Sequence, residues 1–132
     1  MAATIIAGFA HNIVVGRSSF GAPWLVHFHA WVMMGWLGLY VTQNSLIFAD
    51  NVALHRRLGW PSLIWLPAIL VMGLVITRYS LQQGGGPFFF DQNEFLFSNP
   101  AILLLSVALA AWAVTVRRNT GWHRRLMFCS FA

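Results

Sequence analysis

The stretch that decides the fold class is Trp24–Ala49, which reads WLVHFHAWVMMGWLGLYVTQNSLIFA. It contains no Asp, Glu, Lys or Arg. A helix of about 20 predominantly apolar residues is long enough to cross the hydrocarbon core of a bilayer. The stretch therefore predicts a membrane-spanning helix that is long enough to cross with some tilt.

The composition of the whole chain agrees with this prediction. Of its 132 residues, 58% are hydrophobic and only 8% are charged, whereas soluble domains have about 25% charged residues. So few charges cannot cover a soluble domain, and such high hydrophobicity excludes a disordered chain. The single cysteine, Cys129, excludes a disulfide scaffold and a cysteine-based metal site within one chain.

We expect an all-α integral membrane bundle that forms a single domain over residues 1–132, with about four to five transmembrane helices. The expected helices cover residues 2–16, 24–49, 58–78, 100–117 and 122–132. Ser98 and Asn99 precede Pro100, which is typical of a helix start. We therefore expect a loop over residues 79–97, in which residues 88–90 and 95–97 lie at the membrane interface or pack on the bundle. The first and last helices are too short to span, which suggests part of a longer protein.

The arginines predict the orientation. Six of the eight lie in two clusters beside apolar runs: Arg56, Arg57, Arg117, Arg118, Arg124 and Arg125. By the positive-inside rule both links face the cytoplasm, where they would contact anionic lipid headgroups. We expect a multi-pass protein of the bacterial inner membrane. Nucleic-acid binding is not expected, because nucleic-acid readers spread basic residues over a folded face.

A short repeat accompanies these arginines. The sequence His-Arg-Arg-Leu occurs at His55–Leu58 and again at His123–Leu126, 68 residues later. Both copies lie where an ascending helix is expected to start. The repeat predicts two related helical hairpins in parallel orientation, a known way of building membrane bundles.

The histidines allow two interpretations. The expected topology places three of them near the outer surface and two near the inner surface: His11, His27, His29, His55 and His123. Histidines at both faces of a bundle are the axial ligands of b-type cytochromes, so haem b is a candidate cofactor. The simpler interpretation is that they lie at helix ends or contact lipid headgroups.

A polar stripe runs along the expected helix of residues 24–49. His29, Trp36 and Gln43 are seven residues apart and share one face, and Asn44 lies beside them. Uncharged polar residues in a membrane helix normally face protein or a cavity. Hydrogen bonds between helices explain the stripe more simply than a quinone or substrate site does.

No enzyme signature accompanies these features, and the sequence predicts neither catalytic residues nor a metal site apart from the haem alternative. The expected function is therefore that of a non-catalytic bundle subunit in a larger membrane complex, such as a respiratory or photosynthetic one. Its expected partners are the lipid bilayer and other membrane subunits. The alternative is a b-type cytochrome that passes electrons across the bilayer.

Three motifs also suggest a family. His27-Phe28-His29, His-Arg-Arg-Leu-Gly at residues 55–59 and His-Arg-Arg-Leu-Met at residues 123–127 resemble those of a bacterial multi-pass membrane protein family without an assigned biochemical role. The similarity covers roughly residues 27–127. It implies a topology more than an activity, and members of the family are longer than this chain.

Overall fold

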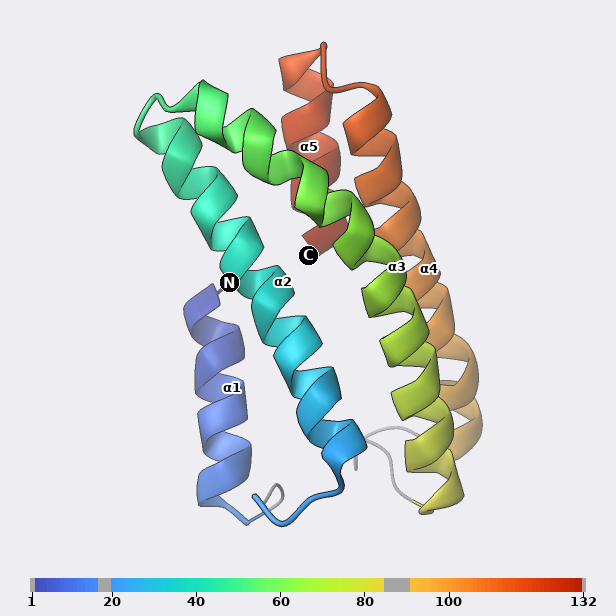
Figure 1. The fold of residues 1–132 in the computed structure, drawn as a ribbon. Coiled ribbons are helices and arrows are strands. Elements are labelled where there is room, and N and C mark those ends of the chain that lie inside the picture. Colours follow the sequence, from blue (N-terminus) through green and yellow to red (C-terminus); the bar gives the residue numbers. More distant parts are fainter. Residues whose placement is uncertain (1, 17–19, 85–90, 132) are drawn as a thin grey trace. The chain divides into compact units, whose positions relative to one another are not determined.

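The computed structural model describes residues 2–16, 20–84 and 91–131. All regular structure in these ranges is helical, as expected (Figure 1). The helices are α1 (Ala2–Val14), α2 (Trp24–Phe48), α3 (Val52–Gln82), α4 (Gln92–Thr115) and α5 (Thr120–Phe131). The chain divides within α3 into two compact units, residues 1–59 and 60–132, and each is described by itself.

In the first unit, a short turn joins α2 to α3. The N–H of Ala49 donates to Ser45 O at the end of α2. Asp50 then adopts a left-handed conformation with φ of 55°, which Asp tolerates better than most residues. Asn51 follows, and its side-chain oxygen accepts a hydrogen bond from the N–H of Leu54 at 3.1 Å. Asn51 therefore caps the start of α3.

The expected starts of two helices are wrong. We expected a helix from residue 58, but α3 begins at Val52 because Asn51 provides the cap. We expected the next helix from Pro100, but α4 begins at Gln92, where Asp91 Oδ1 accepts from the N–H of Asn93 at 2.8 Å. Residues 79–82 and 92–97 thus belong to helices and not to the expected loop, because α3 continues to Gln82 and α4 begins at Gln92. Residues 85–90 of that loop lie outside the described residues.

In the second unit, α3 and α4 come close at Gly73. A Cβ atom at this position would lie 2.5 Å from Leu103 Cδ2. One turn further along, Asn99 Nδ2 donates to Thr77 Oγ1 at 2.6 Å. The two contacts fix one antiparallel register, since 73 pairs with 103 and 77 with 99. Thr77 is buried at 3% exposure, so the hydrogen bond lies inside the helix pair.

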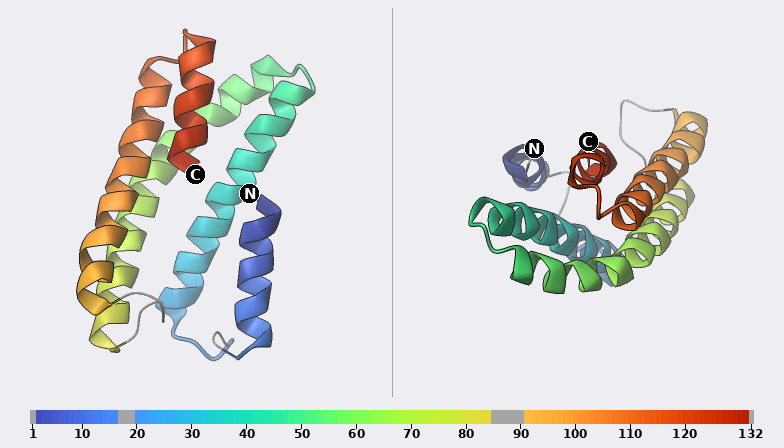
Figure 2. Two further views of the ribbon diagram at one scale, coloured as in Figure 1. Left: turned by 180° about the vertical axis from the view of Figure 1, so that it is seen from behind. Right: turned by 90° about the horizontal axis from the view of Figure 1, so that it is seen from above.

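Helices α4 and α5 lie side by side in this unit (Figures 1 and 2). Small residues on α4 permit the close packing, because Ala110 and Ala113 are 1% and 0% exposed. On α5 the buried residues are Leu126 and Ser130, which are one turn apart. Asn119 starts α5, and its Oδ1 accepts from the N–H of Trp122 at 3.2 Å.

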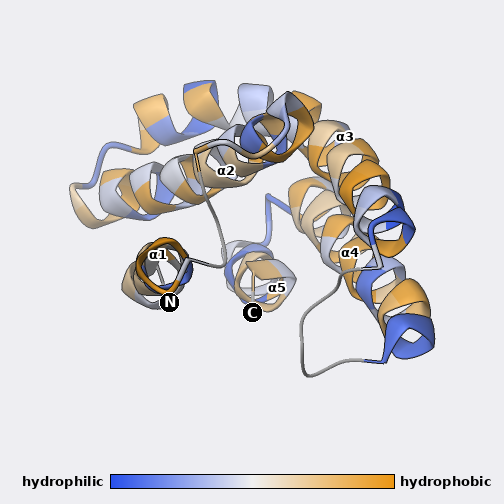
Figure 3. Ribbon diagram, turned by 90° about the horizontal axis from the view of Figure 1, so that it is seen from below, coloured by the Kyte–Doolittle hydropathy of each residue, from blue (hydrophilic) through white to orange (hydrophobic). Residues whose placement is uncertain are grey.

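Two helices in the described ranges, α3 and α4, are long and apolar enough to cross a membrane. Figure 3 shows their hydrophobic residues, with hydrophilic residues gathered where α3 ends and α4 begins. Helix α2 has 25 residues and no charge but does not reach the same hydropathy. The mean hydropathy of α2 is lowered by its polar residues His27, His29, Gln43 and Asn44. That α2 spans a membrane therefore stays a prediction, as does the number of four to five spans.

Candidate functional site

The polar stripe of α2 is the first candidate site. His29 and Gln43 are half-buried. His29 Nδ1 and both amide atoms of Gln43 are buried, yet none of them has a hydrogen-bond partner among the described residues. Trp36 lies between them and is also half-buried. A buried polar group without a partner costs about 1–3 kcal/mol, so this face of α2 is suited to a polar group that hydrogen-bonds to it.

Asn44 differs from the rest of the stripe. It is exposed, and its Nδ2 donates to the Tyr40 carbonyl of the preceding turn at 2.8 Å. Its amide N–H group is thus satisfied within α2 itself. The structure therefore separates Asn44 from His29 and Gln43, although the sequence places all of them on one side of the helix.

Another surface of α2 is aromatic and exposed. Trp24, Phe28 and Trp31 are 75%, 45% and 62% exposed. The Trp24 and Phe28 rings are tilted with centroids 6.5 Å apart, and the Phe28 and Trp31 rings are stacked at 6.1 Å. Contiguous exposed apolar surface often marks a site of contact with a partner or a membrane. Lipid or another protein is the environment that this surface suits.

The histidines, which form the haem alternative, are engaged in different ways. His11 and His27 are exposed, and His27 Nε2 lies 3.2 Å from Phe20 O. His55 is half-buried in the second turn of α3. His123 Nδ1 lies 2.8 Å from Ala113 O. Since a carbonyl only accepts, this nitrogen must carry the proton. In the described part of the chain, no three His, Cys, Asp or Glu side chains gather as a metal site.

The His-Arg-Arg-Leu repeats occupy equivalent positions in their helices. Each histidine is the fourth residue of a helix that an asparagine caps, namely Asn51 for α3 and Asn119 for α5. All six predicted headgroup-binding arginines are exposed: Arg56, Arg57, Arg117, Arg118, Arg124 and Arg125. Arg117 additionally donates from Nη1 to Val114 O at 3.1 Å. The arginines are therefore accessible to lipid phosphates.

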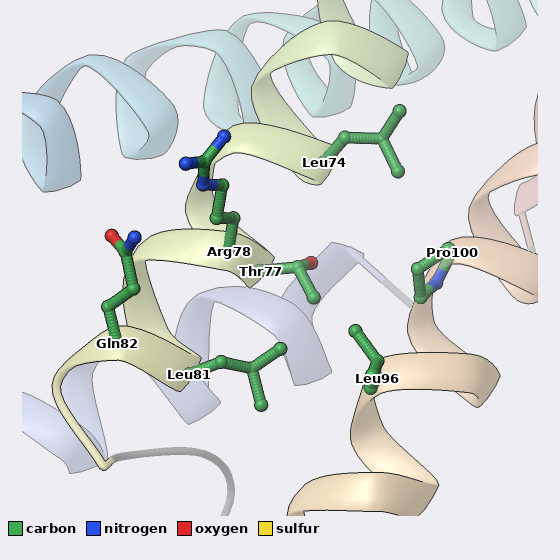
Figure 4. A pocket seen from close by; sticks show the side chains of 7 residues that line it. All are labelled: Leu74, Thr77, Arg78, Leu81, Gln82, Leu96 and Pro100. Atoms are coloured by element: carbon green, nitrogen blue, oxygen red, sulfur yellow. The ribbon is translucent and has the colours of Figure 1, made fainter.

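A groove between α3 and α4 is a site that the sequence analysis missed. It has a volume of about 460 Å³ and is lined by Leu74, Thr77, Arg78, Leu81, Gln82, Leu96 and Pro100. Figure 4 shows Leu74, Thr77 and Leu81 directed toward α4, whereas Arg78 and Gln82 leave α3 on another side. The groove is mainly apolar and has two polar residues at its edge.

The sequence does not predict the groove, because the loop expected over residues 79–97 includes Leu81, Gln82 and Leu96 of its lining. The sequence did contain the signal for an earlier helix start, since Asp91 is followed three residues later by Glu94. This spacing is typical of the first turn of a helix. With α4 begun at Gln92, Leu96 comes to face α3 (Figure 4).

No protein-family model matches the chain, and neither a curated protein nor a solved structure is significantly similar to it. The family resemblance of its motifs consequently stays a prediction.

Proposed function

We propose that this chain is a non-catalytic helical subunit of a larger assembly in a bacterial inner membrane, which it crosses several times. The apolar helices α3 and α4 support the membrane part of the proposal, because most of the residues in their apolar stretches are unburied. On α4, Ile102, Leu104 and Leu105 are 62%, 53% and 61% exposed. Lipid tails or apolar partner helices would cover them.

The observation that most supports a partner subunit is the polar stripe of α2. His29 and Gln43 have buried polar atoms without a hydrogen-bond partner among the described residues. They lie four turns apart on one face, so a single neighbouring helix could reach both. Polar side chains in membrane helices normally bond across helix interfaces. A polar helix of another subunit would satisfy them.

Extraction of the tagged full chain from its native membrane in a mild detergent, followed by a native gel, tests this proposal. We expect the chain in a complex larger than its monomer. Gln43→Leu should shift most of the chain to a smaller species. Asn44→Leu is the matched control, because Asn44 is exposed and bonded within its own helix. A monomer in the unchanged chain, or equal effects of both substitutions, would contradict the proposal.

A b-type cytochrome is the alternative, and one observation favours it. The hydrogen bond to Ala113 O fixes the proton of His123 on Nδ1, which puts the lone pair on Nε2, the usual arrangement in metal-ligating histidines. An absorption spectrum of the same purified material decides between the two proposals. A Soret band that His123→Phe weakens would support haem, and the absence of the band would remove it.

A further inference from the structure

We propose that the groove between α3 and α4 binds an anionic phospholipid, with one acyl chain in the groove and the phosphate at Arg78. This inference rests on the proposed membrane location. It differs from the predicted headgroup contacts of the arginine clusters, because it concerns the opposite ends of the helices and a defined binding site.

The lining of the groove selects for an acyl chain. Leu74, Leu81, Leu96 and Pro100 provide apolar walls. The volume of about 460 Å³ lies within the range of about 300–1,000 Å³ that is usual for small-molecule sites. Leu96 is still 44% exposed, so an occupant would remove apolar surface from its surroundings.

Among the lining residues of α3 that Figure 4 shows directed toward α4, the polar one is Thr77, and it is already hydrogen-bonded. Thr77 Oγ1 donates to Gly73 O at 2.7 Å and accepts from Asn99 Nδ2 at 2.6 Å. Because a hydroxyl has only one proton to donate, Thr77 has no further donor for a ligand. The inner wall therefore behaves as a mainly apolar surface, and the Thr77 hydroxyl offers no donor to a sugar or a nucleotide.

The edge of the groove selects for a negative headgroup. Arg78 and Gln82 are exposed and lie one turn apart on α3. In the part of the chain that the structure describes, Arg78 is the only arginine or lysine between residues 58 and 116. A guanidinium binds phosphate through two parallel hydrogen bonds, and the Gln82 amide can donate as well.

The position of the groove along the helices fits a lipid. Gln82 is the last residue of α3, and Gln92 is the first residue of α4. Hydrophilic residues gather at these ends (Figure 3), which is where a membrane surface would lie. Leu74 is two turns from Gln82 toward the apolar part of α3. The headgroup and the acyl chain would thus meet the side chains that suit each of them.

The test uses the full chain in phosphatidylcholine nanodiscs that contain a trace of phosphatidylglycerol with a photoreactive group in one acyl chain. Mass spectrometry measures crosslinking to residues 74–82 and 96–100. We expect more labelling by this lipid than by photoreactive phosphatidylcholine. Arg78→Gln should lower the labelling about fivefold, which corresponds to the loss of one arginine near the membrane surface. The control is Arg124→Gln, which removes an exposed arginine of the predicted cytoplasmic cluster and should leave the labelling unchanged.

A second pair of variants tests the acyl-chain site without changing charge. Leu96→Trp fills the groove and should therefore lower labelling by both lipids. The control is Leu104→Trp, which lies on the same helix but outside the groove and should leave the labelling unchanged. Equal labelling by the two lipids, equal effects of the two arginine variants, or equal effects of the two tryptophan variants would overturn the inference. If alkaline carbonate releases the chain from its native membrane, the proposed function itself falls. If the chain stays in the membrane after carbonate treatment but shows any of these three equalities, only the lipid site is refuted and the proposed function stands.

Discussion

The contact between Gly73 and Leu103 gives the sharpest prediction about stability. Helix interiors favour Ala over Gly by about 1 kcal/mol, so Gly73→Ala would stabilise α3 if the surroundings had room. They do not, because the new Cβ would lie 2.5 Å from Leu103 Cδ2 and 3.3 Å from Cδ1. The overlap is with the flexible end of the Leu103 side chain. A strained rotamer of Leu103 would relieve it at about 0.5–1.5 kcal/mol, and separation of the helices would cost about 1–3 kcal/mol.

Gly59 is the matched control, since it lies in the same helix and a Cβ there meets nothing within 4 Å. Gly59→Ala should stabilise the protein by up to about 1 kcal/mol. Gly73→Ala should be less stable than Gly59→Ala by about 0.5–3 kcal/mol, and the lower end applies if Leu103 alone moves. Unfolding of the full chain by SDS in mixed micelles, followed by tryptophan fluorescence, measures the two free energies.

The double variant Gly73→Ala/Leu103→Ala isolates the contact. Removing the Leu103 methyl groups eliminates the overlap, so Ala at position 73 should cost less in this background than in the unchanged chain. Residues in contact usually show coupling energies of about 0.5–3 kcal/mol. If Gly73→Ala matches Gly59→Ala, or if the coupling energy is zero, the close approach of α3 and α4 at this point is refuted.

Three further predictions use the same unfolding measurement. The first concerns the hydrogen bond between Asn99 and Thr77. Loss of this bond in Thr77→Val or in Asn99→Leu should lower the free energy of unfolding by about 0.6 kcal/mol, the average for such bonds in membrane proteins, and the double variant should lose no more than either single variant. Additive losses of stability would contradict the hydrogen bond. The second concerns the equivalent helix caps, which Asn51→Ala and Asn119→Ala remove. Each substitution should lower the free energy of unfolding by about 1 kcal/mol, and a variant with unchanged stability would refute the cap at that position. His123→Phe should destabilise the α4–α5 pair by about 1 kcal/mol through the loss of its bond to Ala113, and an unchanged stability would show that the bond contributes nothing.

The sequence was sufficient to predict helices but not the seam along which α3 and α4 pack. The residues of α4 around Leu103 are apolar on all sides, so hydrophobic periodicity indicates no buried face. In the membrane that we propose for this chain, helix packing is decided instead by shape and by occasional polar groups. A glycine such as Gly73 indicates that another helix can come close, but not which residue it will contact. The contact with Leu103 depends on the register between α3 and α4, which hydrophobic periodicity does not specify.

The polar pair within this seam was hidden for a related reason. Asn99 precedes Pro100, and together they are typical of a helix start. The structure shows Pro100 inside α4 and Asn99 bonded to Thr77. Proline is tolerated in membrane helices because neighbouring groups satisfy the freed carbonyl. The sequence Asn-Pro is therefore compatible both with the start of a helix and with its interior, and the cap at Asp91 shows that here it lies in the interior.

The structure extends the His-Arg-Arg-Leu repeat and bears on its meaning. With the capping asparagines Asn51 and Asn119, each copy becomes an eight-residue unit, Asn-x-x-x-His-Arg-Arg-Leu. The cap fixes where each helix starts, so in both copies the histidine and leucine are at least half-buried and both arginines are exposed. Cations near a helix start gain nothing from the helix macrodipole, which favours them at the other end. Helix stability therefore does not account for the paired arginines, whose exposed side chains are accessible to an anion outside the helix. The paired arginines at the two helix starts are thus placed where the predicted contacts with lipid phosphates are sterically possible.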